Sequence, residues 1–207
     1  MLRFDGHIMG AAFASGHRIV AGRWFDSPFG GFADVMWRDA AGRRLLLASS
    51  PEAAGFIEDQ YAFDEVRVGP VSIQRTGERI EISAGELRLG LRLHRRGLPS
   101  HLLGLQPARL RTLPGWIRAQ DVLARPVLGP LLFGGGRTRL TGTTRAGVRE
   151  WYAIHDFRRA SASADAGARD LGPVGACSPA GFGFSEFPDG AAMVRVTSMF
   201  AGQGGEK

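Results

Sequence analysis

Glycine is the residue that most limits the fold of this chain. Thirty glycines are spread through 207 residues, and they separate short segments that alternate in polarity or are rich in β-forming residues. Such segments, bounded by glycine, are typical of strands and turns. We therefore predict a mainly β fold, either an antiparallel β-barrel or a strongly bent sheet, with one or two short helices. We find no internal repeat or linker, so we expect one β-barrel-like domain over residues 1–200 and a flexible tail over 201–207.

The strands are predicted from alternation and from turn signals. Leucines alternate with small or charged residues over 87–93, which is the pattern of a strand with one buried face. Pro70 indicates a sheet edge or a bulge within the predicted strand 63–74. The segment 160–168 is small and polar, which is typical of an exposed strand or a loop. The other predicted strands cover residues 17–25, 32–38, 43–48, 79–83, 86–94, 138–143, 148–158 and 192–200.

One helix is predicted over residues 51–61. Ser49 and Glu52 have the spacing of a capping box, and Pro51 suits the first turn of a helix. Apolar residues then follow at helical spacing, so this segment is the clearest helix in the sequence.

Residues 98–133 differ from the rest of the chain. Leucine and arginine are frequent there, and five prolines divide the segment into pieces of one to three turns. We predict a helical and loop excursion over one end of the barrel, with a short helix at Gly115–Ala124. A basic, apolar segment can also bind a membrane surface, and this is the alternative interpretation.

Arginine supplies 25 of the 26 lysine and arginine residues, and asparagine is absent. Lysine and asparagine codons are both A-rich, so a GC-rich genome would make both residues scarce; the alternative interpretation of the arginine excess is selection for an anion-binding surface. Because Lys207 is the only lysine, an interior Schiff-base lysine and a phosphate-loop lysine are excluded. The net charge of +6 is dispersed along the chain without a nucleic-acid-binding motif, so a nucleic acid is not the favoured partner.

Cys177 is the single cysteine, which excludes an internal disulfide and fits a reducing compartment. The N-terminus lacks the uninterrupted apolar stretch of a signal peptide, and no charge-free segment is long enough to span a bilayer. We therefore expect a cytoplasmic protein. The five histidines lack metal-binding spacing, and no dinucleotide or hydrolase motif is present, so we expect neither a metal nor a cofactor.

The densest group of functional side chains follows Val148. On a strand, Arg149, Trp151, His155 and Phe157 share one face. If that face lines a cavity, the aromatic rings supply stacking surface, His155 a proton carrier and Arg149 an anion-binding guanidinium. His155 and Asp156 are then the candidates for acid–base catalysis. The alternative is that the rings fill the core while His155 and Arg149 form ordinary hydrogen bonds at its rim.

Trp24 lies in a second candidate segment, residues 23–34. Its aromatic residues and two acids, Asp26 and Asp34, would suit the mouth of a pocket. The alternative is a β-turn in which Asp26 accepts backbone hydrogen bonds and Pro28 fixes the backbone angle φ.

The succession of antiparallel strands, a short helix and aromatic turn residues resembles the lipocalin-like (calycin) barrels, which include proteins that cyclise or hydrate apolar molecules. The resemblance implies a barrel that holds an apolar ligand. The phrase Ser-Pro-Phe-Gly at 27–30 is similar to a segment of acetoacetate-decarboxylase-like proteins. Their catalytic lysine has no counterpart here, so we do not expect their activity.

Barrels can hold an apolar small molecule in a cavity with a few polar anchors. We therefore expect binding of a hydrophobic small molecule, with a carboxylate as one option for its polar group. The first alternative is a cofactor-free isomerase or cyclase that acts on an apolar metabolite in the same cavity. The second is a basic structural or membrane-surface protein. The candidate ligand-binding residues are Trp24, Arg149, Trp151, His155 and Phe157.

Overall fold

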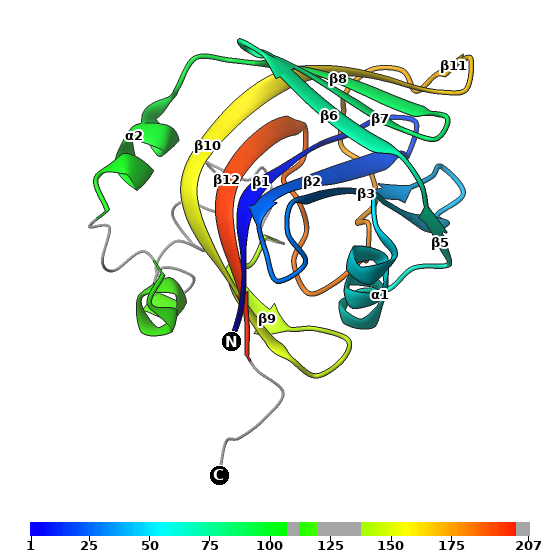
Figure 1. The fold of residues 1–207 in the computed structure, drawn as a ribbon. Coiled ribbons are helices and arrows are strands. Elements are labelled where there is room, and N and C mark those ends of the chain that lie inside the picture. Colours follow the sequence, from blue (N-terminus) through cyan, green and yellow to red (C-terminus); the bar gives the residue numbers. More distant parts are fainter. Residues whose placement is uncertain (107–111, 120–137, 202–207) are drawn as a thin grey trace.

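The computed structural model describes residues 1–106, 112–119 and 138–201. Over these residues the chain is mainly β, and its strands form a strongly curled sheet that makes half of a barrel (Figure 1). The predicted fold class is thereby confirmed, and the half-barrel is compatible with the barrel architecture that the calycin resemblance implies. The strands are β1 (Leu2–Ala12), β2 (Arg18–Asp26), β3 (Phe32–Arg38), β4 (Arg44–Ala48), β5 (Glu65–Val68), β6 (Val71–Thr76), β7 (Arg79–Ala84), β8 (Leu87–Leu93), β9 (Thr141–Thr143), β10 (Arg149–Ala166), β11 (Arg169–Asp170) and β12 (Ala191–Phe200).

The sheet has the strand order β5-β4-β3-β2-β1-β12-β10-β8-β7-β6, and β9 and β11 also pair with β10. The described pairs are antiparallel except β4–β5, which is parallel. Helix α1 (Pro51–Gln60) connects these two strands, as a parallel pair requires a crossover. Helix α2 (Leu98–Gly104) lies beside β10, and residues 114–119 form a further short helical segment.

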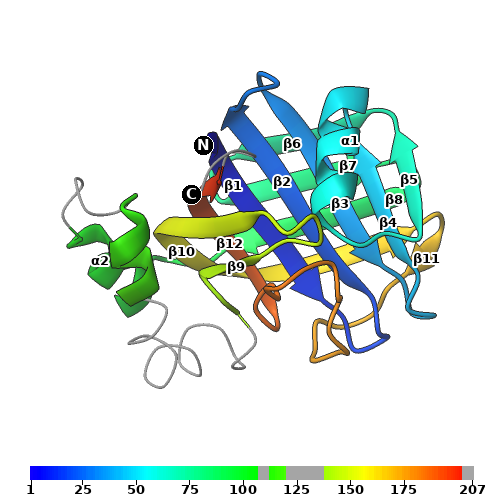
Figure 2. The same cartoon turned by 90° about the horizontal axis from the view of Figure 1, so that it is seen from below.

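The curl of the sheet brings β6 over β3 and encloses the main apolar core (Figure 2). This core joins Met9 and Val35 from the first strands to Ile80 and Ile82 from β7. The alternating leucines of β8 are all buried in it, as the sequence predicts. The other face of β1, β2 and β3 packs against α1, and the candidate site lies on that face.

Strand β1 was not among the predicted strands, although it lies near the middle of the sheet, between β12 and β2. Its second half, from Met9 to Ala12, is buried on both faces, because one face meets the main core and the other carries the site. A strand buried on both faces shows no alternation of apolar and polar residues, which is the signal that sequence analysis uses.

Strand β10 joins two segments that were predicted separately. It runs unbroken from Arg149 to Ala166 and pairs along its length with β9, β12, β8 and β11. The small, polar segment 160–168 is thus mostly a strand paired with β8. Conversely, the predicted strand 63–74 is divided at Gly69 and Pro70 into β5 and β6. Proline lacks the N–H that would continue a ladder.

Helix α1 confirms the predicted helix, but its N-cap is Ser50 rather than Ser49. The Ser50 hydroxyl accepts a hydrogen bond from the Ala53 N–H at 3.2 Å, whereas Ser49 accepts one from the Ala33 N–H. The helix buries Ala53, Ala54 and Ile57 against β4 and the ends of β1 and β12.

The expected excursion 98–133 is described only in part. Its first piece is α2, and Ile117 in the segment 114–119 is fully buried against Trp151 and Met199. The remainder of the predicted helix Gly115–Ala124, from 120 onward, lies outside the described residues, as do 202–207 of the predicted tail. In the described parts of the chain, no helix is long and apolar enough to cross a membrane.

Candidate functional site

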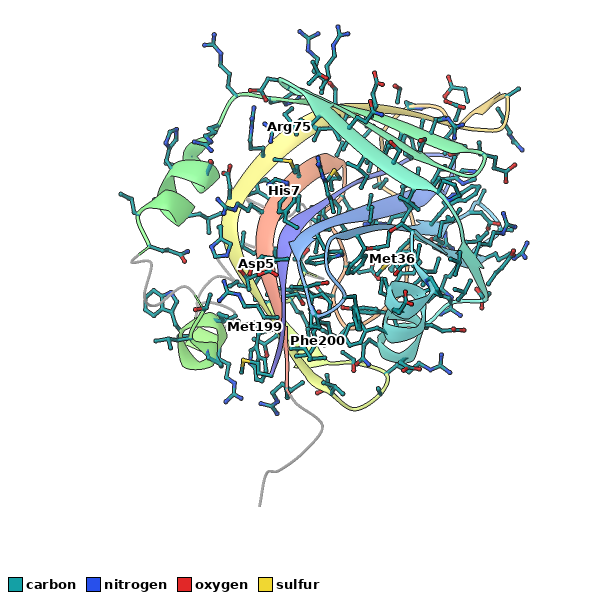
Figure 3. The ribbon with its side chains drawn as sticks, in the orientation of Figure 1. Asp5, His7, Met36, Arg75, Met199 and Phe200 are labelled. Atoms are coloured by element: carbon teal, nitrogen blue, oxygen red, sulfur yellow. The ribbon has the colours of Figure 1, made fainter. Side chains whose placement is uncertain are left out.

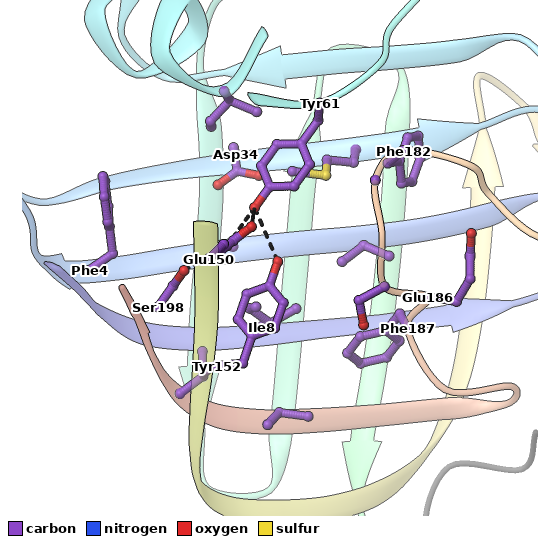
Figure 4. Close-up of a pocket in the computed structure, with 18 of the residues that line it drawn as sticks. Phe4, Ile8, Asp34, Tyr61, Glu150, Tyr152, Phe182, Glu186, Phe187 and Ser198 are labelled. Atoms are coloured by element: carbon purple, nitrogen blue, oxygen red, sulfur yellow. Dashed lines mark hydrogen bonds between the residues drawn. The ribbon is translucent and has the colours of Figure 1, made fainter. Parts of the chain in front are cut away.

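A cavity of about 140 Å³ lies between the sheet, α1 and the loop 180–188 (Figure 4). Its walls come from β1, β2, β3, β10 and β12, so residues distant in sequence meet there. Most of the lining is aromatic or aliphatic, which suits an apolar ligand. The apolar lining residues include Phe4, Ile8, Val20, Met36, Ile57, Ile154, Phe182, Phe187, Val194, Val196 and Phe200.

Glu150 is the polar centre of this cavity and has no exposed surface. The Tyr61 hydroxyl donates to its carboxylate, with distances of 2.7 Å to Oε1 and 2.8 Å to Oε2. The Ser198 hydroxyl donates to Oε1 at 2.8 Å, and the hydroxyls of Tyr61 and Tyr152 lie 3.1 Å apart. The result is a chain of hydrogen-bonding groups from Ser198 through Glu150 and Tyr61 to Tyr152.

Three elements position this cluster. Glu150 and Tyr152 alternate on β10, and Ser198 faces Tyr152 across the β10–β12 ladder, so all three point to one side of the sheet. Tyr61 is the residue that ends α1. The loop backbone at Gly183 packs on its ring, where a Cβ would lie 2.8 Å from the ring Cδ1.

Burial controls the protonation of the cluster. It raises the pKa of Glu150 to about 7, against the lowering effect of the hydrogen bonds from Tyr61, Ser198 and Tyr152. Burial also raises the pKa of Tyr61 and of Tyr152 well above 10, and the nearby Glu150 carboxylate adds to both shifts. Both phenols are therefore neutral hydrogen-bond donors near neutral pH, while Glu150 exchanges its proton there.

Asp34 is a second buried acid on the same cavity. Its Oδ1 accepts a hydrogen bond of 2.9 Å from the indole Nε1 of Trp24, and no described residue donates to its Oδ2. Burial raises the pKa of Asp34 to about 7, and the hydrogen bond from Trp24 partly opposes this shift. The site thus combines two carboxyl groups that titrate near neutral pH with two tyrosine hydroxyls and an apolar wall.

Of the residues predicted to bind a ligand, Trp24 lines the cavity and the others do not. Arg149 is exposed. Trp151 is buried with Ile117, Ala153 and Met199 on the opposite face of β10, and its indole Nε1 has no partner among the described residues. The cavity face of β10 is instead formed by its neighbours, Glu150, Tyr152 and Ile154.

The two predicted acid–base residues also lie away from the cavity. His155 Nε2 is 2.8 Å from the Thr197 hydroxyl, which donates to Asp5 Oδ1 at 2.5 Å. Asp156 accepts from the Ser100 hydroxyl of α2 and forms an ion pair with Arg96 at 3.3 Å.

A bulge explains why Phe157 is not on the predicted face. The β10–β12 register passes from the pair Ile154–Val196 to the pair Asp156–Arg195, which leaves His155 without an opposite residue. The alternation therefore shifts by one after His155. Phe157 pairs with Val194 and shares the face of Ile154, where it is buried beside the cavity lining.

Sequence analysis missed Glu150, Tyr61, Tyr152 and Ser198 as site residues. The first and third lie within the segment that was singled out, but on its other face. Asp34 was noted only as an acid near a pocket mouth. The available signal was a carboxylate within the predicted strand 148–158, since an acid that becomes buried requires partners.

Fixed donors around a buried carboxyl can bind a polar group and move a proton at a defined place. Among the described residues, no group of three His, Cys, Asp or Glu side chains is placed to hold a metal ion. The described side chains of the site can form hydrogen bonds and exchange protons.

No protein-family model matches the sequence, and no curated protein matches it. Among solved structures, acetoacetate decarboxylase from Legionella pneumophila is similar over 96% of this chain and 84% of that chain, with a TM-score of 0.44 and 10% sequence identity.

Proposed function

We propose that this protein binds a small, mainly apolar molecule in the cavity, and that Tyr61, Tyr152 and Glu150 bind its single polar group. The observation that carries the proposal is the hydrogen-bonded cluster around Glu150, which is buried on the wall of an otherwise apolar cavity. Burying a carboxyl group costs free energy unless it is hydrogen-bonded. Buried acids with perturbed pKa values cluster at functional sites.

The cavity volume limits the size of the ligand. In another protein, an apolar cavity of about 150 Å³ accepts benzene, so a cavity of about 140 Å³ suits a molecule with one six-membered ring. Aromatic residues such as Phe4, Trp24 and Phe200 line it and would contact the ring faces and edges.

The charge of the lining favours a neutral polar group over a carboxylate. Glu150 and Asp34 are both buried there, and a ligand carboxylate would be repelled whenever either is ionised. Among the described lining residues the only cation is Arg139, which is exposed, so it would bind a ligand carboxylate only at the rim. A carbonyl or hydroxyl oxygen, by contrast, matches the tyrosine donors.

Calorimetric titration with cyclohexanone, phenol and benzoate tests this proposal. We expect cyclohexanone and phenol to bind and benzoate to bind more weakly at pH 8. Val196→Phe should abolish binding, because the added ring occupies the cavity that Val196 lines. Leu102→Phe, on the exposed surface of α2, is the matched control and should bind normally. Failure of both neutral probes to bind would contradict the proposal.

The loss of a hydroxyl should have a measurable effect on affinity. Tyr152→Phe removes one donor and is expected to weaken cyclohexanone binding by about fivefold, since a hydrogen bond contributes on the order of 1 kcal/mol. Unchanged affinity would show that the ligand oxygen does not bind at the tyrosine cluster.

A further inference from the structure

We infer that this pocket catalyses proton transfer on a carbonyl compound: Asp34 accepts a proton from the carbon beside the carbonyl, while the tyrosine hydroxyls bind the carbonyl oxygen. The inference rests on the proposed function, because the substrate is the ligand of that cavity. It adds a reaction class, the enolisation of a small cyclic ketone and the isomerisations that follow from it.

The two acids of the site differ in what they can do. Both oxygens of Glu150 accept hydrogen bonds from Tyr61, and one also accepts from Ser198. Asp34 accepts one side-chain hydrogen bond from the described residues, from the Trp24 indole N–H to Oδ1. Its Oδ2 has no donor among the described residues, so of the two acids Asp34 has the oxygen available to accept a proton from a ligand.

The position of Asp34 is fixed by its neighbours on β2. Gly22 pairs with Asp34 across the β2–β3 ladder, and a Cβ on Gly22 would lie 2.4 Å from Asp34 Oδ1 and 2.6 Å from Trp24 Nε1. The carboxylate therefore occupies the space that this glycine leaves open. Trp24 acts as a positioning residue, because its hydrogen bond to Oδ1 fixes the orientation of the Asp34 carboxyl group.

Tyr61 and Tyr152 supply the second half of the chemistry. Figure 4 shows Tyr61, Asp34 and Glu150 projecting from different elements into one pocket. Each phenol has one proton. When Glu150 is protonated and donates to Tyr61, Tyr61 can donate to Tyr152, whose own proton is then directed to a ligand oxygen. The cluster thus provides a donor for an oxyanion.

The proposed step is balanced without an oxidant or reductant. The carbon–hydrogen bond breaks and its proton bonds to Asp34 Oδ2, while the electron pair forms a carbon–carbon double bond. The carbonyl π pair moves to oxygen, and a tyrosine hydroxyl stabilises the resulting enolate. Return of the proton to the same carbon gives exchange, and its return to another carbon of a conjugated enolate gives an isomer.

The test follows hydrogen–deuterium exchange at the carbons beside the carbonyl of cyclohexanone, in D₂O, by proton NMR. We expect the full chain to accelerate exchange above buffer, and Asp34→Asn to lower the rate by at least about 100-fold, in the range for general-base catalysis. Its affinity for cyclohexanone should change far less. Asp39→Asn, at the half-buried turn after β3 and outside the cavity lining, is the matched control and should retain the wild-type rate.

The pH profile identifies which acid is the base. The titratable and charged groups that line the same cavity are Tyr61, Arg139, Glu150, Tyr152 and Glu186. The exchange rate should pass through a maximum near pH 7, because Asp34 must have lost its proton while Glu150 must still hold one. Glu150→Gln should keep the rise near pH 7 and remove the fall above it, because the glutamine amide can donate to Tyr61 at every pH while burial and Trp24 still set the pKa of Asp34.

Trp24→Phe keeps the inference testable if Asp34→Asn does not fold. It removes the hydrogen bond that lowers the pKa of Asp34, so the rise should move to higher pH. Binding of cyclohexanone without accelerated exchange, or equal rates in wild type and Asp34→Asn, would overturn the inference alone. Absence of binding to both neutral probes would overturn the proposed function and the inference with it.

Discussion

Gly22 faces Asp34 across the β2–β3 ladder, and the missing side chain at Gly22 leaves the space in which the Asp34 carboxylate lies. Because Gly22 has no side chain, the Asp34 carboxylate can approach the backbone of β2 closely and accept a hydrogen bond from the indole N–H of Trp24. The requirement at Gly22 is one of space and not of backbone angle, so a single methyl group tests it.

Gly22→Ala is therefore predicted to displace the Asp34 carboxylate or the Trp24 ring. We expect a loss of about 1–3 kcal/mol in the free energy of unfolding, as for other overpacked sites. Urea unfolding followed by tryptophan fluorescence measures it. Gly55→Ala in α1 is the control, because its Cβ meets nothing within 4 Å. It should be neutral or stabilising by about 0.5–1 kcal/mol, and equal effects of the two substitutions would contradict the packing argument.

Glu150→Gln is predicted to change how stability depends on pH. The pKa of Glu150 is 4.5 ordinarily and about 7 in the folded protein, so between these values the unfolded chain releases a proton that the folded chain keeps. The free energy of unfolding therefore falls as pH rises from 4.5 to 7. One pKa unit corresponds to about 1.4 kcal/mol, so the part due to Glu150 is about 3 kcal/mol.

Urea titrations at pH 5 and pH 8 measure this effect. Glu150→Gln should lose less stability between the two pH values than the wild type does. The exposed Glu58 on α1 provides the control, and Glu58→Gln should reproduce the wild-type difference. If the difference in the free energy of unfolding between wild type and Glu150→Gln is the same at pH 5 and at pH 8, the raised pKa of Glu150 is refuted.

Spectrophotometric titration of tyrosine should report on the site alone. The chain has two tyrosines, Tyr61 and Tyr152, and both belong to the cluster. Burial and the Glu150 carboxylate raise the pKa of each well above 10. We therefore expect no rise in absorbance at 295 nm near pH 10 in the folded protein, and an ordinary transition near pH 10 in urea. Titration of either phenol near pH 10 in the folded state would show that the cluster is open to water.

His7 is predicted to make the protein sensitive to acid. Burial, and then the charges of Arg75, Arg195 and Arg23, lower its pKa from 6.5 to about 4, against the opposing effect of Asp156. As pH falls from 6.5 toward 4, the unfolded chain gains a proton at His7 that the folded chain does not, so the free energy of unfolding falls. His7→Gln should reduce this fall, whereas His94→Gln, at an exposed position, should not. Thermal unfolding at pH 7 and pH 5 measures the difference.

The sequence predicts those elements that have one buried face or a strong end signal. The leucines of β8 alternate because one face meets the core, and Pro51 with a serine before it marks the start of α1. Strand β1 has neither signal, since Met9 and Gly10 are buried on opposite faces. Burial on two faces depends on what the sheet curls around, which local sequence does not encode.

The site could be predicted less well than the fold. Alternation shows that Glu150 and Tyr152 share a face and that Trp151 lies on the other. It does not show which face meets a cavity. That depends on α1 and the loop 180–188, and the decisive contact, from Tyr61 to Glu150, joins residues 89 positions apart. The bulge at His155 also has no local signature, and it places Phe157 on the face opposite to the predicted one.

The pairing of β1 with β12 has a consequence for biosynthesis. Leu2 pairs with Phe200 and Ala11 with Ala191, so the seam near the middle of the sheet joins segments that leave the ribosome at the beginning and the end of this stretch. Until β12 emerges, β1 keeps one edge unpaired while β2, β3 and β4 can already assemble on the other. Such long-range pairing slows folding and leaves the edge of β1 open to pairing with other chains until β12 has been made.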